Sequence, residues 1–169
     1  MQTREGSTRI ITGMLSLHPH QQIEETGEAE VVVLDDFRHN RLTRHRASSP
    51  TVRVVIADGQ ALVRAGFHVL LEAGSIAVTG EAGNGDEAVA LARGTGADVV
   101  LLDANLPGFE GTCRTLSGSG VAVMLLTESE DDERLLVALR ARASSVIAKN
   151  ARPGELLRAV RLLAELRVP

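Results

Sequence analysis

The sequence predicts an α/β domain in which helices cover both faces of a parallel sheet. Three observations favour this fold class. Short apolar runs without a polar interruption recur from residue 52 onwards, as expected of strands buried on both faces. Segments with the period of amphipathic helices separate these runs. Several runs end on a polar residue, which suits the rim of such a sheet, where ligands bind.

Composition narrows the class further. The chain has 169 residues, of which 44% are hydrophobic and only 2% aromatic, so the core must consist of aliphatic side chains and alanine. A net charge of −4 argues against a strongly basic surface that binds nucleic acid. The single cysteine, Cys113, permits no internal disulfide and suits a reducing cytoplasm. No apolar run approaches the roughly 20 residues of a membrane span, and the first residues lack the pattern of a secretory signal.

The first 50 residues differ from the rest of the chain. We interpret residues 1–50 as a mostly disordered N-terminal extension and linker, because they are polar without a sustained hydrophobic period. Residues 29–36 (AEVVVLDD) are the exception and could form a short strand, although no matching helix follows them. Residues 37–46 form a basic, solvated run. The regular domain is expected over residues 51–168.

The first half of this domain predicts two strand–helix units. An apolar run over 52–57 predicts a strand that ends at Asp58. Residues 60–73 carry apolar side chains on one side and stop at Gly74, as a helix does. A second strand is expected over 76–81. Asn84 is placed to cap a helix from residue 85 to about 93.

The second half repeats the alternation three times. Strands are expected over 98–103, 121–126 and 144–148. The first of them ends on Asp103 and is followed by a weak helix over about 109–116, which glycines shorten to a single or frayed turn. A helix with an acidic start is expected over 130–140, and Pro153 begins the last helix.

Four polar residues should meet at one rim of the sheet. Asp58, Asp103 and Thr127 end three parallel strands, and Lys149 follows a fourth. Two carboxylates, a hydroxyl and an ammonium suit a phosphoryl group. Asp103 can act as the nucleophile, Asp58 can hold a divalent metal ion, Thr127 can donate a hydrogen bond, and Lys149 can neutralise developing charge. Lys149 is the only lysine in a chain that otherwise uses arginine, which favours a need for a compact charge there.

Each of these residues also has a structural interpretation without chemistry. Asp58 could cap the first helix, and Thr127 could cap the helix over 130–140. Lys149 could lie on the surface. His68 is expected on a solvated helix face rather than as a metal ligand. Cys113 has only Arg114 nearby as a basic partner and is expected to be inert.

The residues resemble the receiver domain of two-component response regulators, most closely the NarL/LuxR type. The matching text is VRVVIADGQALVRAGFHVLLEAG, GEAGNGDEAVALA, DVVLLDANLPGFEG, VMLLT and AKNARPGELLRAVR. This resemblance implies a flavodoxin-like (βα)5 doubly wound sheet with strand order 2-1-3-4-5. It also implies that Asp103 accepts phosphate from a sensor histidine kinase and that Thr127 and Lys149 are the switch residues. Asp58, Asp103 and the backbone carbonyl of Asn105 would bind Mg²⁺.

The chain departs from the pattern of that family at several positions. Gly59 stands where the family has a second acid, so we expect weak Mg²⁺ binding. Val146 stands where the family has an aromatic residue three positions before the lysine, and Asn150 replaces the proline after it. No helix-turn-helix follows the last predicted helix in this sequence, so we expect no direct binding of nucleic acid.

These features predict a signalling module rather than an enzyme. We expect a receiver domain that accepts a phosphoryl group on Asp103, with Mg²⁺ as a weakly bound cofactor and a sensor histidine kinase as its partner. The alternatives are a phosphorylation-independent interaction or dimerisation module, a fragment of a DNA-binding transcriptional regulator, and a small phosphatase, which would need a general acid that the sequence does not supply. Arginines and acids in the fourth and fifth helices predict a weak homodimer through those helices, in the cytoplasm and without membrane contact.

Overall fold

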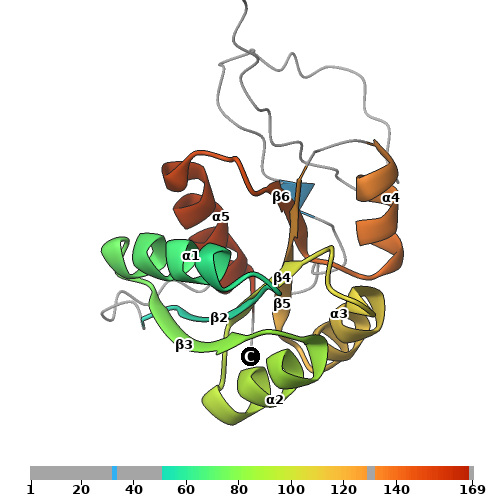
Figure 1. Cartoon of the computed structure of the whole chain (residues 1–169), viewed down its shortest axis with the longest axis horizontal. Helices are drawn as coiled ribbons and strands as arrows, with labels where there is room; N and C mark the ends of the chain where they lie inside the picture. Colours follow the sequence, from blue (N-terminus) through green and yellow to red (C-terminus); the bar gives the residue numbers. More distant parts are fainter. Residues whose placement is uncertain (1–31, 34–50, 129–131, 168–169) are drawn as a thin grey trace, which may run out of the picture.

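The computed structural model describes residues 32–33, 51–128 and 132–167. Its sheet has the strand order β1-β6-β5-β4-β2-β3 (Figure 1). The strands are β1 (Val32–Val33), β2 (Arg53–Ala57), β3 (Ala77–Ala82), β4 (Val99–Asp103), β5 (Ala122–Thr127) and β6 (Ser145–Ala148). Strands β2 to β6 are parallel, and counted among themselves they have the order 2-1-3-4-5. The predicted fold class and strand order are therefore confirmed.

Five helices cover the two faces of the sheet. They are α1 (Ala61–Ala73), α2 (Gly85–Thr95), α3 (Phe109–Gly118), α4 (Asp132–Arg140) and α5 (Pro153–Leu166). Helices α1 and α5 lie on one face, and α2, α3 and α4 lie on the other (Figure 1). None of the helices in the described part of the chain is long and apolar enough to cross a membrane.

Alternate residues of the strands pack into two separate hydrophobic cores, one on each face of the sheet. In β2, Val54 and Ile56 pack in the core beneath α1 and α5, whereas Val55 and Ala57 pack in the core beneath the other three helices. Successive side chains of a strand point to opposite faces, so a sheet covered on both sides needs apolar residues at every position. This requirement explains the uninterrupted apolar runs of the sequence.

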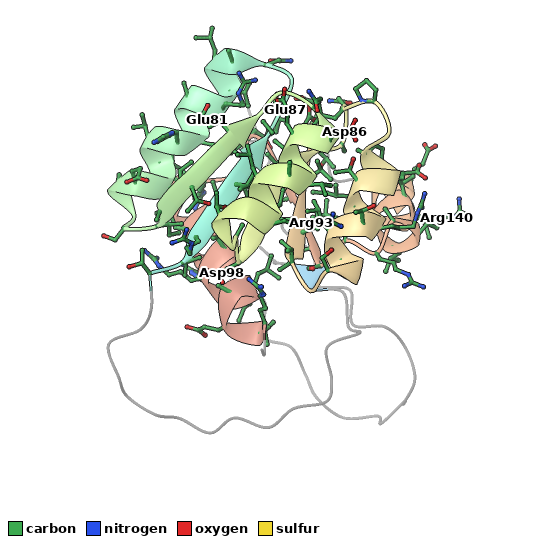
Figure 2. The ribbon with its side chains drawn as sticks, turned by 90° about the horizontal axis from the view of Figure 1, so that it is seen from below. Glu81, Asp86, Glu87, Arg93, Asp98 and Arg140 are labelled. Carbon is green, nitrogen blue, oxygen red and sulfur yellow. The ribbon has the colours of Figure 1, made fainter. Side chains whose placement is uncertain are left out.

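Helix α2 begins and ends as its sequence predicts. The Asn84 side chain caps it by accepting a hydrogen bond from the backbone N–H of Glu87, at 2.9 Å. Figure 2 shows Asp86 and Glu87 at one end of the helix and Arg93 towards the other. Acids near the N-terminus and a base near the C-terminus complement the helix dipole.

The helix expected over about 109–116 is present as α3, but the expectation that it is short or frayed was wrong. A single or frayed turn was expected over about 109–116, but the helix has 10 residues and extends to Gly118. Its inner face buries Cys113 and Leu116 in the core. Tertiary burial of an apolar face outweighs the weak helix propensity of the segment. Gly120, whose φ of 78° lies in the left-handed region, comes after the helix and therefore does not weaken it.

One strand was not predicted to join the sheet. Val32 lies opposite Val146 and Val33 opposite Ser145, so β1 pairs antiparallel with the outer edge of β6. This pair lies within the stretch 29–36 that the sequence marked as a possible strand. The rest of the extension predicted over 1–50, its basic run included, lies outside the described residues, as do the first residues of the helix expected over 130–140.

Candidate functional site

The carboxyl ends of four parallel strands meet at one rim of the sheet. Asp58 follows the last residue of β2, Asp103 ends β4, and Thr127 ends β5. Lys149 follows β6 and donates its backbone N–H to the carbonyl of Thr127 at 2.7 Å. The register pairs Asp103 with Leu126 and Thr127 with Ala148, which keeps these strand ends level. The rim predicted from the strand ends therefore exists.

Lys149 joins the two aspartates. Its Nζ lies 2.8 Å from Asp58 Oδ2 and 3.2 Å from Asp103 Oδ1. Asp58 is fully buried, and Asp103 is 4% exposed, so both carboxylates depend on a nearby cation. Burial by itself lowers the pKa of an ammonium, but the contacts with Asp58 and Asp103 outweigh it and raise the pKa of Lys149. Lys149 is thus the counter-charge of a buried acidic pair rather than a surface residue.

Asp58 contacts both the start of α1 and the rim lysine, although the N-cap residue of α1 is Gln60 rather than Asp58. Its Oδ1 accepts a hydrogen bond from the backbone N–H of Gln60 at 2.8 Å, at the start of α1. Its other oxygen faces Lys149. Arg64, which the sequence analysis did not single out, donates from one guanidinium nitrogen to the carbonyl of Asp58 at 2.7 Å. The position of Arg64 in the first turns of α1 was the only signal for this contact.

Asp103 is held by the turn that follows it. Its Oδ1 accepts a hydrogen bond from the backbone N–H of Asn105 at 3.0 Å, and the carbonyl of Asp103 accepts from Leu106 at 3.2 Å. Gly108, with a φ of 71°, adopts the left-handed conformation that starts α3. Within the described part of the chain, the hydrogen bond and the ion pair of the Asp103 side chain both involve Oδ1.

Thr127 brings a buried hydroxyl to the rim. The residue is 3% exposed, and its Oγ1 has no hydrogen-bond partner within the described part of the chain. Buried hydroxyl groups normally have a partner, so an isolated one at a rim lined by charged groups suits an incoming acceptor oxygen. This observation favours the binding interpretation of Thr127 over that of a helix cap.

The donor atoms at the rim fit magnesium in kind. Asp58 and Asp103 offer carboxylate oxygens, and Mg²⁺ is commonly held by one or two carboxylates together with water and substrate phosphate. Within the described residues, no group of three or more His, Cys, Asp or Glu side chains could hold a metal ion. The position next to Asp58 is Gly59, whose side chain offers no ligand atom.

Two other candidate residues have structural roles. Cys113 is buried, and this burial raises the pKa of its thiol to about 12, so the thiol is unreactive near neutral pH. His68 lies on α1 with its Nδ1 2.6 Å from Glu81 Oε1. The Glu81 side chain lies close to α1 (Figure 2), and its Oε2 is 3.5 Å from Nε of Arg64 on that helix. Both residues therefore stand apart from the rim chemistry.

Comparison with known proteins places the chain in one protein family. Residues 54–161 match the family described as the response regulator receiver domain. The transcriptional regulatory protein YxjL of Bacillus subtilis is 36% identical over 118 residues, which are 67% of this chain and 54% of that protein. The nitrate/nitrite response regulator protein NarL of Escherichia coli is 32% identical over 113 residues, which are 63% and 52% of the two chains. The chain thus spans about half the length of these curated relatives.

Solved structures agree with these sequence matches. The signal receiver domain of the response regulator NarL from Mycobacterium tuberculosis superposes with a TM-score of 0.63 at 29% identity. The superposition covers 68% of this chain and 97% of that domain. Chemotaxis protein CheY4 of Vibrio cholerae, at 21% identity and a TM-score of 0.61, shares the fold.

Proposed function

We propose that this chain, which belongs to the response regulator receiver domain family, accepts a phosphoryl group on Asp103 and passes the signal on to transcription. Receiver domains are signalling modules rather than enzymes. The observation that carries the proposal is the rim itself, where Asp58 and Asp103 share one buried ammonium beside the Thr127 hydroxyl, which has no hydrogen-bond partner among the described residues. We assign this role to residues 51–168 and place the protein in the cytoplasm.

The proposed reaction is a transfer from a phosphohistidine of a sensor histidine kinase. An oxygen of Asp103 attacks phosphorus, a P–O bond forms, and the P–N bond breaks with its electron pair returning to the imidazole ring. Lys149 neutralises charge on the transferred group, and Thr127 donates its hydroxyl hydrogen to a phosphoryl oxygen. Asp58, Asp103 and the backbone carbonyl of Asn105 would hold Mg²⁺, which supplies further neutralisation of the phosphoryl charge.

Small phosphodonors test this proposal without the kinase. Incubation with phosphoramidate and Mg²⁺, followed by intact-mass measurement, should show the gain of one phosphoryl group. The Asp103→Asn variant should show none. Asp86→Asn removes an exposed carboxylate from α2 and is the matched control, which should behave as the wild type. A folded wild-type protein that gains no mass at high Mg²⁺, or a gain that survives in Asp103→Asn, contradicts the proposal.

A phosphorylation-independent interaction module is the second candidate function. Two observations favour it: Gly59 leaves the rim with two buried carboxylates, and Lys149 already neutralises part of their charge. In this case the wild type gains no mass with phosphoramidate. Its folding and its binding to a protein partner do not depend on phosphorylation. The same experiment therefore decides between the two functions.

We further propose a weak homodimer through α4 and α5. The side chains of Leu136 and Leu139 are 53% and 40% exposed and lie three residues apart on α4, so they are neighbours on one apolar face of that helix. Because β1 pairs with the outer edge of β6, helix faces rather than that strand edge are expected to meet. Sedimentation velocity should show the average mass rising with concentration, and Leu136→Glu should suppress the rise. A chain that stays strictly monomeric at high micromolar concentration contradicts this proposal.

A further inference from the structure

A third carboxylate reaches the ammonium of Lys149. Glu128 directly follows Thr127, and its Oε1 lies 3.6 Å from Lys149 Nζ. The Glu128 side chain is 64% exposed, whereas that of Lys149 is only 11% exposed. The rim lysine is therefore surrounded by two buried aspartates and one glutamate that stands at the solvent boundary, and the function proposed above does not use this glutamate.

The Glu128 carboxylate adds to an excess of negative charge around Lys149. One ammonium faces the carboxylates of Asp58, Asp103 and Glu128, so the described groups in contact with each other carry a net charge of two negatives. Conversion of Asp103 into its acyl phosphate adds about one further negative charge, since a phosphoryl group carries about −1.5 to −2 near pH 7. The phosphoryl oxygens and Glu128 then compete for the same cation.

We propose that Glu128 is a positioning residue that restrains Lys149 and thereby slows phosphorylation of Asp103. This inference rests on the proposed function of Asp103. The Glu128 carboxylate acts in two ways: it holds Lys149 at the outer side of the rim, and it repels the anionic donor that must approach Asp103. Neither effect needs Glu128 to touch the phosphoryl group.

The size of the effect follows from the exposure of the glutamate. Exposed ion pairs contribute about 0.2–1 kcal/mol, so Glu128→Gln should speed phosphorylation by roughly 1.4-fold to fivefold. Salt screens exposed charges strongly, because the Debye length falls from about 10 Å at 0.1 M to about 3 Å at 1 M. The advantage of Glu128→Gln over the wild type should therefore shrink as salt is raised.

A matched set of variants separates charge from bulk. Glu128→Gln removes the charge and keeps the size, and Glu128→Ala removes both. Glu165→Gln makes the same charge change in the last turn of α5, and the neighbouring Arg167 contacts Asp98, which precedes β4 at the opposite end of the sheet. Each variant is incubated with phosphoramidate and Mg²⁺ at low and high salt, and the rate of mass gain is measured.

The single lysine provides a second readout that does not depend on phosphorylation. Because Lys149 is the only lysine in the sequence, lysine-selective isotope labelling gives one side-chain signal in NMR spectra. That signal should shift in Glu128→Gln and stay in place in Glu165→Gln. The expected result is this shift together with faster, salt-sensitive phosphorylation.

Other outcomes overturn either this inference or the proposed function. An unchanged Lys149 signal, or a rate that rises only in Glu128→Ala, overturns the restraint by charge, because bulk rather than the carboxylate would then matter. A shifted signal in a protein that no donor phosphorylates in any variant overturns the proposed function of Asp103, and the restraint on that reaction with it.

Discussion

Replacing Gly59 by aspartate is expected to tighten Mg²⁺ binding by about tenfold or more, since the loss of even an outer-shell partner of a metal ligand costs about 10–100-fold in affinity. The structure leaves room for the new side chain. A Cβ at Gly59 would meet only Leu106 Cδ2, at 3.7 Å, which is an ordinary van der Waals contact. The added carboxylate stands next to Asp58, and the rim then offers three acids besides the exposed Glu128.

Calorimetric titration with Mg²⁺ measures this effect directly. The chain contains no tryptophan and no tyrosine, so intrinsic fluorescence of those residues is not a usable signal. Gly59→Asn is the matched control, because it has nearly the size of aspartate without its charge. Equal affinities for the Asp and Asn variants would show that the missing charge at position 59 does not limit metal binding.

The same variant should respond to Mg²⁺ in its stability. Without metal, a third carboxylate beside Asp58 and Asp103 adds like-charge repulsion and should lower the free energy of unfolding. A ligand that binds only the folded state stabilises it in proportion to its affinity. Without Mg²⁺, the melting temperature of Gly59→Asp should therefore lie below that of the wild type. It should then rise more steeply as the Mg²⁺ concentration is increased.

The sequence predicted the fold and the rim because both depend on local patterns. The uninterrupted apolar run of β4 is visible without the structure, and the parallel arrangement follows from the alternation of strands and helices. Once the sheet is parallel, Asp58, Asp103 and Lys149 must lie on the same rim, whatever their distance in sequence. The ion pairs at 2.8 and 3.2 Å agree with that expectation.

The features that the sequence did not predict depend on tertiary contacts. The length of α3 is set by the burial of Cys113 and Leu116, which outweighs weak propensity. The pairing of Val32 with Val146 joins residues too far apart for any periodic signal. The contact between Arg64 and the carbonyl of Asp58 likewise needs the geometry of α1 against β2. The contact between Glu128 and Lys149 had only one indication in the sequence, the position of Glu128 next to Thr127. That position alone does not show that the two side chains meet, because the location of Lys149 is needed as well.

Replacing Lys149 by methionine is expected to cost about 3 kcal/mol of stability near pH 7, because removal of one partner from a buried ion pair costs about 3–5 kcal/mol and this rim borders solvent. Methionine has a similar length and no charge, so Asp58 and Asp103 would face each other without a cation. Urea unfolding followed by circular dichroism measures the loss. Lys149→Arg, which keeps the charge, should lose much less and is the matched control.

The pH dependence identifies the cause of this loss. In Lys149→Met, the two buried carboxylates lose the cation that they shared, which favours uptake of a proton by one of them. The folded variant then binds more protons than the unfolded chain, so its stability rises as the pH falls from 7 towards about 5. The wild type has the opposite sensitivity: the raised pKa of Lys149 means that its stabilisation is present below that pKa and is lost only at alkaline pH.

A second substitution tests the same charge repulsion by removing one of the two carboxylates. Adding Asp103→Asn to Lys149→Met leaves Asp58 as the one buried acid of the pair, so repulsion disappears and part of the lost stability should return. The coupling energy between residues in direct contact is about 0.5–3 kcal/mol, which a double-mutant cycle resolves. Additive effects of the two substitutions, with a flat pH profile for Lys149→Met, would show that Lys149 contributes packing rather than charge. Lys149 could then contact a phosphoryl group without first breaking a stabilising ion pair. The proposed restraint by Glu128 would in that case have little effect on the rate of phosphorylation.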